Sequence, residues 1–243
     1  MRRSLKIALI ASLIGNLTIV YVGYKAYQYR QYINYWLDKY LVVVDEFSGR
    51  SVYAEENRLL ESDRGQPERI VFLGTQVTAE WDVVQAFPQW QAVNRGIPGQ
   101  RVAGFVLRFY PDVIELKPRA VVIEISSYNF RPGMTVNEIQ DYAASMADLA
   151  RAHDIEPIIG TVIPPAERVQ DVGEYSVFDS VLVFNEWLRR YADSGRTTLV
   201  DFAAVLAADS GRLDPEFAVT AVDLNADGYA RISVALGRVL NSR

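Results

Sequence analysis

The chain of 243 residues contains no cysteine and only one histidine. The lack of cysteine excludes disulfide bonds, thiol nucleophiles and cysteine-ligated metals. The single imidazole, His153, excludes a site built from several histidines, and a Ser-His-Asp triad would have to use that ring. We therefore expect no metal site and no cofactor.

An excess of positive charge is also missing. The net charge is −5, the pI is about 5.1, and 50% of the residues are apolar. Proteins that bind nucleic acids need a basic face to contact phosphates, so this class of function is excluded. The length and the apolar fraction predict one globular domain with a substantial core and an N-terminal appendage.

Formal charge is absent from residues 7–24, IALIASLIGNLTIVYVGY, which lie between Lys6 and Lys25. As a helix this stretch would be roughly 27 Å long, about the thickness of a hydrocarbon core. A cleaved signal peptide is the alternative, but its apolar region would usually be shorter and no A-x-A pattern follows. We predict an uncleaved signal anchor with a tail at residues 1–6 and a transmembrane helix at residues 7–26.

Basic residues flank this predicted span on both sides. Arg2, Arg3 and Lys6 precede it, whereas Lys25 and Arg30 follow it. Basic residues favour the cytoplasmic side, and the N-terminal group suggests a cytoplasmic N-terminus. Our hypothesis is a single-pass protein of a bacterial inner membrane, with its domain on the periplasmic side.

Aromatic side chains are concentrated after the predicted span. Seven of the fourteen tyrosines lie between Tyr21 and Tyr40, with Trp36 among them. An aromatic belt at the membrane interface is one interpretation, and a helix face that binds a partner is the other. The candidate partner-binding residues are Tyr24, Tyr27, Tyr32, Tyr35 and Trp36.

Residues 27–67 are predicted to form this aromatic-rich juxtamembrane helix and a linker. Within them, residues 50–66 are open to two interpretations, a linker or an added cap over the sheet of the following domain. We expect contacts with the lipid bilayer and with other subunits of a membrane complex through the transmembrane and tyrosine-rich helix.

From residue 68 to residue 243 the pattern alternates between short β-rich runs and longer helical segments. The clearest helix follows Thr135, which forms a capping-box pattern with Glu138. Alternating strands and helices predict a doubly wound, mainly parallel sheet, with binding sites at the carboxyl ends of the strands. The β-rich runs are IVFL, AVN, AVVIEI, PIIGTVI and TTLVDF.

Four segments of this domain resemble, in order, the conserved blocks of the SGNH (GDSL-type) hydrolases. They are IVFLGTQVTAEW, NRGIPGQRVAGFVLRF, AVVIEISSYNF and AVDLNADGYARI, within residues 68–240. The resemblance implies an α/β fold, a flavodoxin-like three-layer α/β/α sandwich with a parallel sheet. It also implies relatives that act as esterases, lipases or acyl-transfer enzymes on lipids or carbohydrates.

The family's nucleophilic serine corresponds by this resemblance to Gln76. A carboxamide cannot form a covalent acyl intermediate, because it yields no usable nucleophile near neutral pH. Thr75 or Thr78 is the alternative nucleophile. The oxyanion-hole glycine of the family corresponds to Gly96.

Other catalytic positions of the family also differ. The oxyanion-hole asparagine corresponds to Tyr128, although a shift of one residue would let Asn129 serve. The aspartate and histidine of the triad correspond to Thr220 and Asp223. Asp223 is either a base for a bound water or, with Asn225 and Asp227, a cap of the last helix.

The single histidine is not expected to replace the missing triad member. His153 ends a helix before a strand, at the edge of the sheet opposite the catalytic one. We predict no catalytic residue and a non-catalytic, membrane-anchored subunit with a structural or accessory role in a photosynthetic, respiratory or envelope complex.

Two alternative functions remain open. The first is a module that binds carbohydrate or lipid in the vestigial pocket, and the second is a divergent envelope esterase or acetyltransferase. The candidate ligand-binding residues are Gln76, Tyr128, Asn129 and Arg131.

Overall fold

A computed structural model describes residues 2–61, 68–131, 133–167 and 176–242. The chain divides into two compact units, Met1–Phe47 and Ser48–Arg243.

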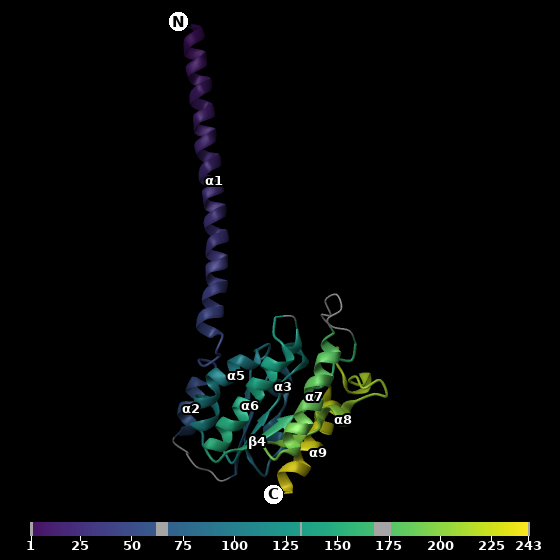
Figure 1. Cartoon of the computed structure of the whole chain (residues 1–243). Coiled ribbons are helices and arrows are strands. Elements are labelled where there is room, and N and C mark those ends of the chain that lie inside the picture. Colours follow the sequence, from purple (N-terminus) through teal and green to yellow (C-terminus); the bar gives the residue numbers. More distant parts are fainter. Residues whose placement is uncertain (1, 62–67, 132, 168–175, 243) are drawn as a thin grey trace. The chain divides into compact units, whose positions relative to one another are not determined.

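The first unit consists of one long helix, α1 (Arg2–Glu46) (Figure 1). Its 45 residues extend over roughly 68 Å at 1.5 Å per residue, about twice the thickness of a hydrocarbon core. The stretch Arg3–Leu37 is long and apolar enough to cross a membrane. The five candidate partner-binding aromatics lie on this helix with exposed fractions of 55–62%. The predicted helix through the aromatic run is confirmed.

The second unit contains a sheet of five parallel strands in the order β2-β1-β3-β4-β5. This is the flavodoxin-like strand order, so the predicted fold class is confirmed. The strands are β1 (Arg69–Gly74), β2 (Gln91–Gly96), β3 (Ala120–Ile123), β4 (Glu156–Gly160) and β5 (Thr198–Val200).

Helices cover both faces of the sheet, because side chains alternate along each buried strand. In β1, Val71 and Leu73 belong to one core cluster, and Ile70 and Phe72 belong to the other. The first cluster includes side chains of α5 (Val102–Phe109), α6 (Val136–Ala152) and α7 (Val177–Asp193). The second includes side chains of α3 (Gln76–Glu80), α4 (Val83–Ala86), α8 (Phe202–Leu206) and α9 (Ala226–Asn241).

The predicted capping box of α6 is present. The Thr135 hydroxyl accepts from the backbone N–H of Glu138, and the Glu138 carboxylate accepts from the N–H of Thr135. His153 is the C-terminal cap residue of α6, directly before β4. Its imidazole is exposed and meets the Tyr110 ring edge-to-face, with the ring centroids 6.4 Å apart. Such pairs typically have centroids about 4.5–7 Å apart.

The compact domain begins at Ser48, earlier than the predicted start at residue 68. The described part of the segment includes α2 (Ala54–Glu61), and its contacts with the domain explain the difference. The Tyr53 hydroxyl donates to the carbonyl of Gly96 at 2.5 Å, and its ring lies 4.5 Å from the guanidinium carbon of Arg95. In residues 50–61, therefore, the added-element interpretation holds rather than the linker.

A buried network of four polar side chains fixes this segment to the sheet. We call Asn57, Arg95, Arg108 and Asp112 the clamp network, and their exposed fractions are 0–5%. Arg108 pairs with Asp112 at 2.8 Å, and Asn57 donates to Asp112 at 2.6 Å while accepting from Arg95. Arg95 also pairs with the exposed carboxylate of Glu56 at 3.0 Å. Buried charges are tolerated here because each has a partner.

Candidate functional site

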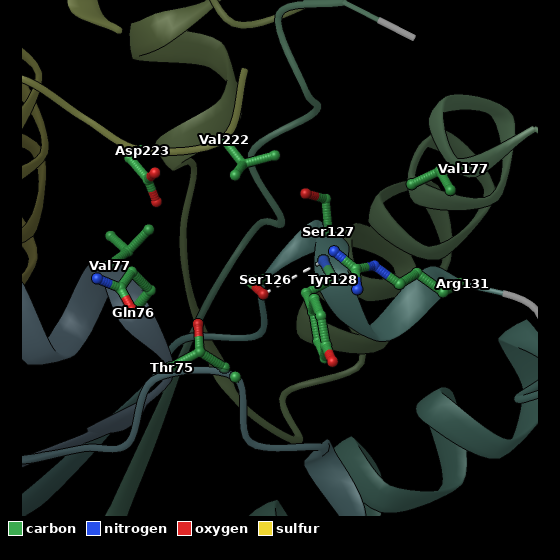
Figure 2. A pocket seen from close by; sticks show the side chains of 11 residues that line it. Thr75, Gln76, Val77, Ser126, Ser127, Tyr128, Arg131, Val177, Val222 and Asp223 are labelled. Atoms are coloured by element: carbon green, nitrogen blue, oxygen red, sulfur yellow. Dashed lines mark hydrogen bonds between the residues drawn. The ribbon is translucent and has the colours of Figure 1, made fainter. Parts of the chain in front are cut away.

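A pocket of about 440 Å³ lies among the loops that follow the strands (Figure 2). Its position at the carboxyl ends of parallel strands is the one predicted from the alternating pattern. Gln76, Val77 and Asp223 lie on one side of it, and Tyr128 and Arg131 on the other. The lining residues are Thr75, Gln76, Val77, Gly99, Ser126, Ser127, Tyr128, Arg131, Val177, Val222 and Asp223.

The turn after β1 is fixed in its conformation by hydrogen bonds to a buried carboxylate, that of Glu124. Glu124 accepts from the Thr75 backbone N–H at 2.7 Å and from the hydroxyls of Thr75 and Thr78 at 3.0 and 3.1 Å. A Cβ on Gly74 would come within 2.0 Å of the Thr78 hydroxyl and 2.6 Å of Glu124. Glycine at residue 74 is therefore required by the packing around this carboxylate.

The surroundings of Glu124 alter its protonation. Burial raises the pKa of this carboxyl above its usual value, and the hydrogen bonds from Thr75 and Thr78 act in the opposite direction. The hydroxyls of Thr75 and Thr78 both donate to this carboxylate, so both are part of the hydrogen bonding that stabilises the turn.

Gln76 is the first residue of α3 and lines the pocket. Its amide donates to the carboxylate of Glu80, one helical turn further on. Gln76, which corresponds by the family resemblance to the nucleophile, therefore lies where β1 is followed by α3, at the pocket wall.

Gly96 does not line the pocket, contrary to its expected role in an oxyanion hole. Its backbone N–H donates to the side chain of Asn94 at 2.8 Å, and a Cβ there would lie 2.3 Å from the backbone nitrogen of Ala79. Close packing of α3 against β2 thus explains this glycine. The glycine that does line the pocket is Gly99, with φ +72°.

Tyr128 and Asn129 point to different surroundings. Tyr128 lines the pocket, whereas Asn129 is fully buried outside the lining and accepts from the Val102 N–H at 2.7 Å. Within the described residues, the Asn129 side-chain nitrogen has no hydrogen-bond partner. A shift that brings Asn129 into the pocket in place of Tyr128 is therefore not observed.

Two arginines flank the Tyr128 ring. The guanidinium carbon of Arg131 lies 3.6 Å from the ring centroid, and that of Arg101 lies 5.6 Å from it. Burial lowers the pKa of Arg131, and the positive charge of Arg101 lowers it further, against the effect of Tyr128.

Asp223 brings a carboxylate to the opposite wall. It accepts from the Thr220 hydroxyl at 2.7 Å, and the Thr220 oxygen in turn accepts from the Asp223 N–H at 3.2 Å. Asp223 does not cap the last helix, whereas Asn225, expected to cap it together with Asp223, does so by accepting from the Gly228 N–H. The carboxylate of Asp223 lines the pocket instead.

A profile of the GDSL-like lipase/acylhydrolase family matches residues 74–231, more than half of the chain. The chain belongs to this family. None of the curated proteins compared with it matches.

Solved structures with the same fold agree with this membership. A GDSL-like lipase from Bacteroides thetaiotaomicron has a TM-score of 0.70 and 25% identity, covering 81% of this chain and 98% of that one. A lipolytic G-D-S-L family protein from Veillonella parvula has a TM-score of 0.58 and 17% identity, covering 71% and 98%. A mutant acetyl-xylooligosaccharide esterase from Geobacillus has a TM-score of 0.59 and 18% identity, covering 72% and 94%.

Five lining residues of this GDSL-like protein were candidates from the sequence: Thr75, Gln76, Tyr128, Arg131 and Asp223. Thr220 stands directly behind Asp223, as its hydrogen-bond donor. His153 instead borders a separate surface hollow with Tyr110. Within the described residues no group of three histidine, aspartate or glutamate side chains could hold a metal.

Other lining residues were missed. Ser126 and Ser127 follow β3. The hydroxyl of Ser126 caps the short turn after it by accepting from the Tyr128 N–H at 3.3 Å, and a serine at the start of a turn is a signal that the sequence offered. Val177 is the first residue of α7 and Val222 lies in the loop before α9, and no local pattern marks either of them.

Proposed function

We propose that this family member is non-catalytic and that its domain has a structural or accessory role while tethered to a membrane. The observation that carries the proposal is Gln76, whose amide occupies the pocket wall at the end of β1. A carboxamide supplies no nucleophile at this point.

The surrounding hydroxyls support the same interpretation. Those of Thr75 and Thr78 donate to Glu124, and that of Ser126 caps the turn before Tyr128. The carboxylate of Asp223 has Thr220 as its donor rather than an imidazole. The lipase and esterase names of the similar structures describe those proteins, and they motivate the assay that tests this proposal.

The test is hydrolysis of short-chain nitrophenyl esters by the purified full-length chain in detergent. We expect no turnover above that of the detergent blank, and Gln76→Ser alone is expected to restore none. Turnover that is abolished in Asp223→Ala would overturn the proposal and favour a divergent esterase or acetyltransferase.

The accessory role concerns α1. This helix is about twice as long as a hydrocarbon core is thick, so its aromatic run extends beyond the span expected at residues 7–26. Exposed aromatic side chains are enriched at protein interfaces. We propose that they contact other membrane subunits, in a bacterial inner membrane with the domain on the periplasmic side.

Gentle detergent extraction at native expression tests this role. The double variant Tyr24→Ala, Tyr35→Ala is expected to lose co-purifying subunits. The matched control is Tyr29→Ala with Tyr40→Ala, because these two residues lie about 120–160° around the helix from Tyr24 and Tyr35. Purification of the wild-type protein alone, or equal loss in both variants, would contradict an interface on this face.

A second candidate function is favoured by the pocket itself. Three of the four predicted ligand-binding residues, Gln76, Tyr128 and Arg131, line it. Its volume of about 440 Å³ lies in the range of small-molecule sites. A non-catalytic domain with such a pocket can bind a ligand without converting it.

A further inference from the structure

Two arginines, Arg101 and Arg131, lie against the ring of Tyr128; Arg131 is among the residues that line the pocket, and Arg101 is not. Arg58, Arg151, Arg189 and Arg190 each form an ion pair. Within the described residues, neither Arg101 nor Arg131 forms one, although both are half-buried. Both guanidiniums lie against the same aromatic ring, so positive charge gathers at this wall of a protein whose net charge is −5.

A guanidinium matches the geometry of a phosphate group, because its planar N–H donors bind two oxygens at once. Two adjacent guanidiniums complement the charge of a phosphate better than that of a single carboxylate. The partly desolvated setting strengthens such an interaction relative to one in open water.

The opposite wall of the pocket, which carries Asp223, favours a ligand group that is not anionic. Asp223 is the lining carboxylate there, and it would repel a second anionic group. It can accept hydrogen bonds from a hydroxyl or an ammonium group. Val77, Val177 and Val222 also line the pocket and offer contacts for a carbon skeleton.

We propose that the pocket binds a phosphate ester, with the phosphate at Arg131 and a hydroxyl or ammonium group at Asp223, while the nearby charge of Arg101 adds to the attraction for the phosphate. This inference rests on the ligand-binding candidate above and specifies its ligand class. The ligand is either a soluble phosphate ester or the headgroup of a phospholipid, and the two share this chemistry.

Isothermal titration calorimetry on the full-length chain in an uncharged maltoside detergent tests the phosphate end. The probes are inorganic phosphate, glycerol 3-phosphate and phosphoethanolamine. Arg131→Gln is expected to weaken binding of the two esters by roughly tenfold or more, and the double variant with Arg101→Gln by more. The matched control is Arg231→Gln, because Arg231 also stacks on an aromatic ring, Phe217, but in a different surface hollow. It is expected to change affinity by less than about twofold.

Asp223→Asn tests the other end. This variant is expected to weaken binding of phosphoethanolamine, while affinity for inorganic phosphate stays equal or rises because a repulsive charge is removed. A parallel loss for both probes would contradict the assigned orientation. Thermal unfolding of each variant separates these effects from loss of folding.

The proposal is overturned if no probe binds at about 5 mM, or if the double arginine variant binds as well as the wild type. Nanodiscs distinguish the two sources. Competition by phosphatidylethanolamine in the disc against soluble phosphoethanolamine indicates a headgroup ligand, and no competition indicates a soluble ester.

One more measurement separates this inference from the proposed function. The same preparation is incubated with a lysophospholipid, and release of fatty acid is followed. Release would contradict the non-catalytic function and leave phosphate binding intact, whereas absent binding without release would contradict only the ligand assignment.

Discussion

Helix α5 carries an arginine at each end, and their surroundings differ. Arg108, in the last turn, is fully buried and pairs with Asp112 while donating to the carbonyl of Arg95 at 2.8 Å. Arg101, the N-terminal cap residue, is half-buried, lies beside Tyr128 and forms no ion pair within the described residues.

The difference separates two uses of the same residue type. In the clamp network every charge has a partner, and the network joins the segment after residue 48 to the sheet. At the pocket, Arg131 and the neighbouring Arg101 form no ion pair within the described residues, so their N–H donors can serve a ligand. Charges that are satisfied within the fold stabilise it, and charges that are not provide binding capacity.

The largest expected effect breaks the clamp network. Arg108→Ala leaves Asp112 buried without its cation, which we expect to lower the free energy of unfolding by about 3–5 kcal/mol. Urea unfolding in detergent, followed by tryptophan fluorescence, measures the change. The control is Arg189→Ala, which breaks an exposed pair with Asp201 and should lose at most about 1 kcal/mol. Similar losses in both variants would contradict a stabilising role specific to the network.

The next effect concerns the turn beneath the pocket. Gly74→Ala places a Cβ against Thr78 and Glu124, and overpacking of this kind costs about 1–3 kcal/mol. Gly237→Ala is the matched control, because its Cβ meets nothing within 4 Å and alanine favours the interior of α9 by about 1 kcal/mol. The same unfolding assay should therefore give opposite signs for the two variants. A neutral Gly74→Ala would show that the turn is not tightly packed.

A smaller, pH-dependent effect is expected at Glu124. Its pKa is raised in the folded state, so the stability linked to its protonation is present below the unfolded pKa of about 4.3 and is lost as pH rises through the folded pKa. Glu124→Gln removes this loss. The stability of the variant relative to the wild type should increase with pH from about 4.3 upward, as measured by unfolding across a pH series. A difference independent of pH would contradict the raised pKa.

The smallest effect returns to the other end of α5. Arg101→Gln should change the free energy of unfolding by no more than about 0.5 kcal/mol, because no ion pair is broken. Unfolding measured beside Arg108→Ala tests the contrast directly. A decrease of more than about 1 kcal/mol in the free energy of unfolding would show that Arg101, like Arg108, stabilises the fold.

Much of this fold could be predicted from local patterns. The short β-rich runs, the capping box at Thr135 and the long apolar stretch at the N-terminus each depend on neighbouring residues, so the sequence displays them. The start of the domain could not be predicted, because Asn57 acquires its role only through Arg95 and Asp112, which lie far along the chain.

Some features of the pocket, likewise, could be predicted from the sequence, and others could not. The sequence alone determined that Gln76 follows the first strand and that no second histidine exists, and both restrict the chemistry through residue identity. Only the tertiary structure decided that Gly99 rather than Gly96 lines the pocket, that Asp223 faces it, and that two arginines share one ring. The physical reason is that a residue's identity fixes what its side chain can do, whereas hydrogen bonds and charges from distant segments decide whether it is free to do so.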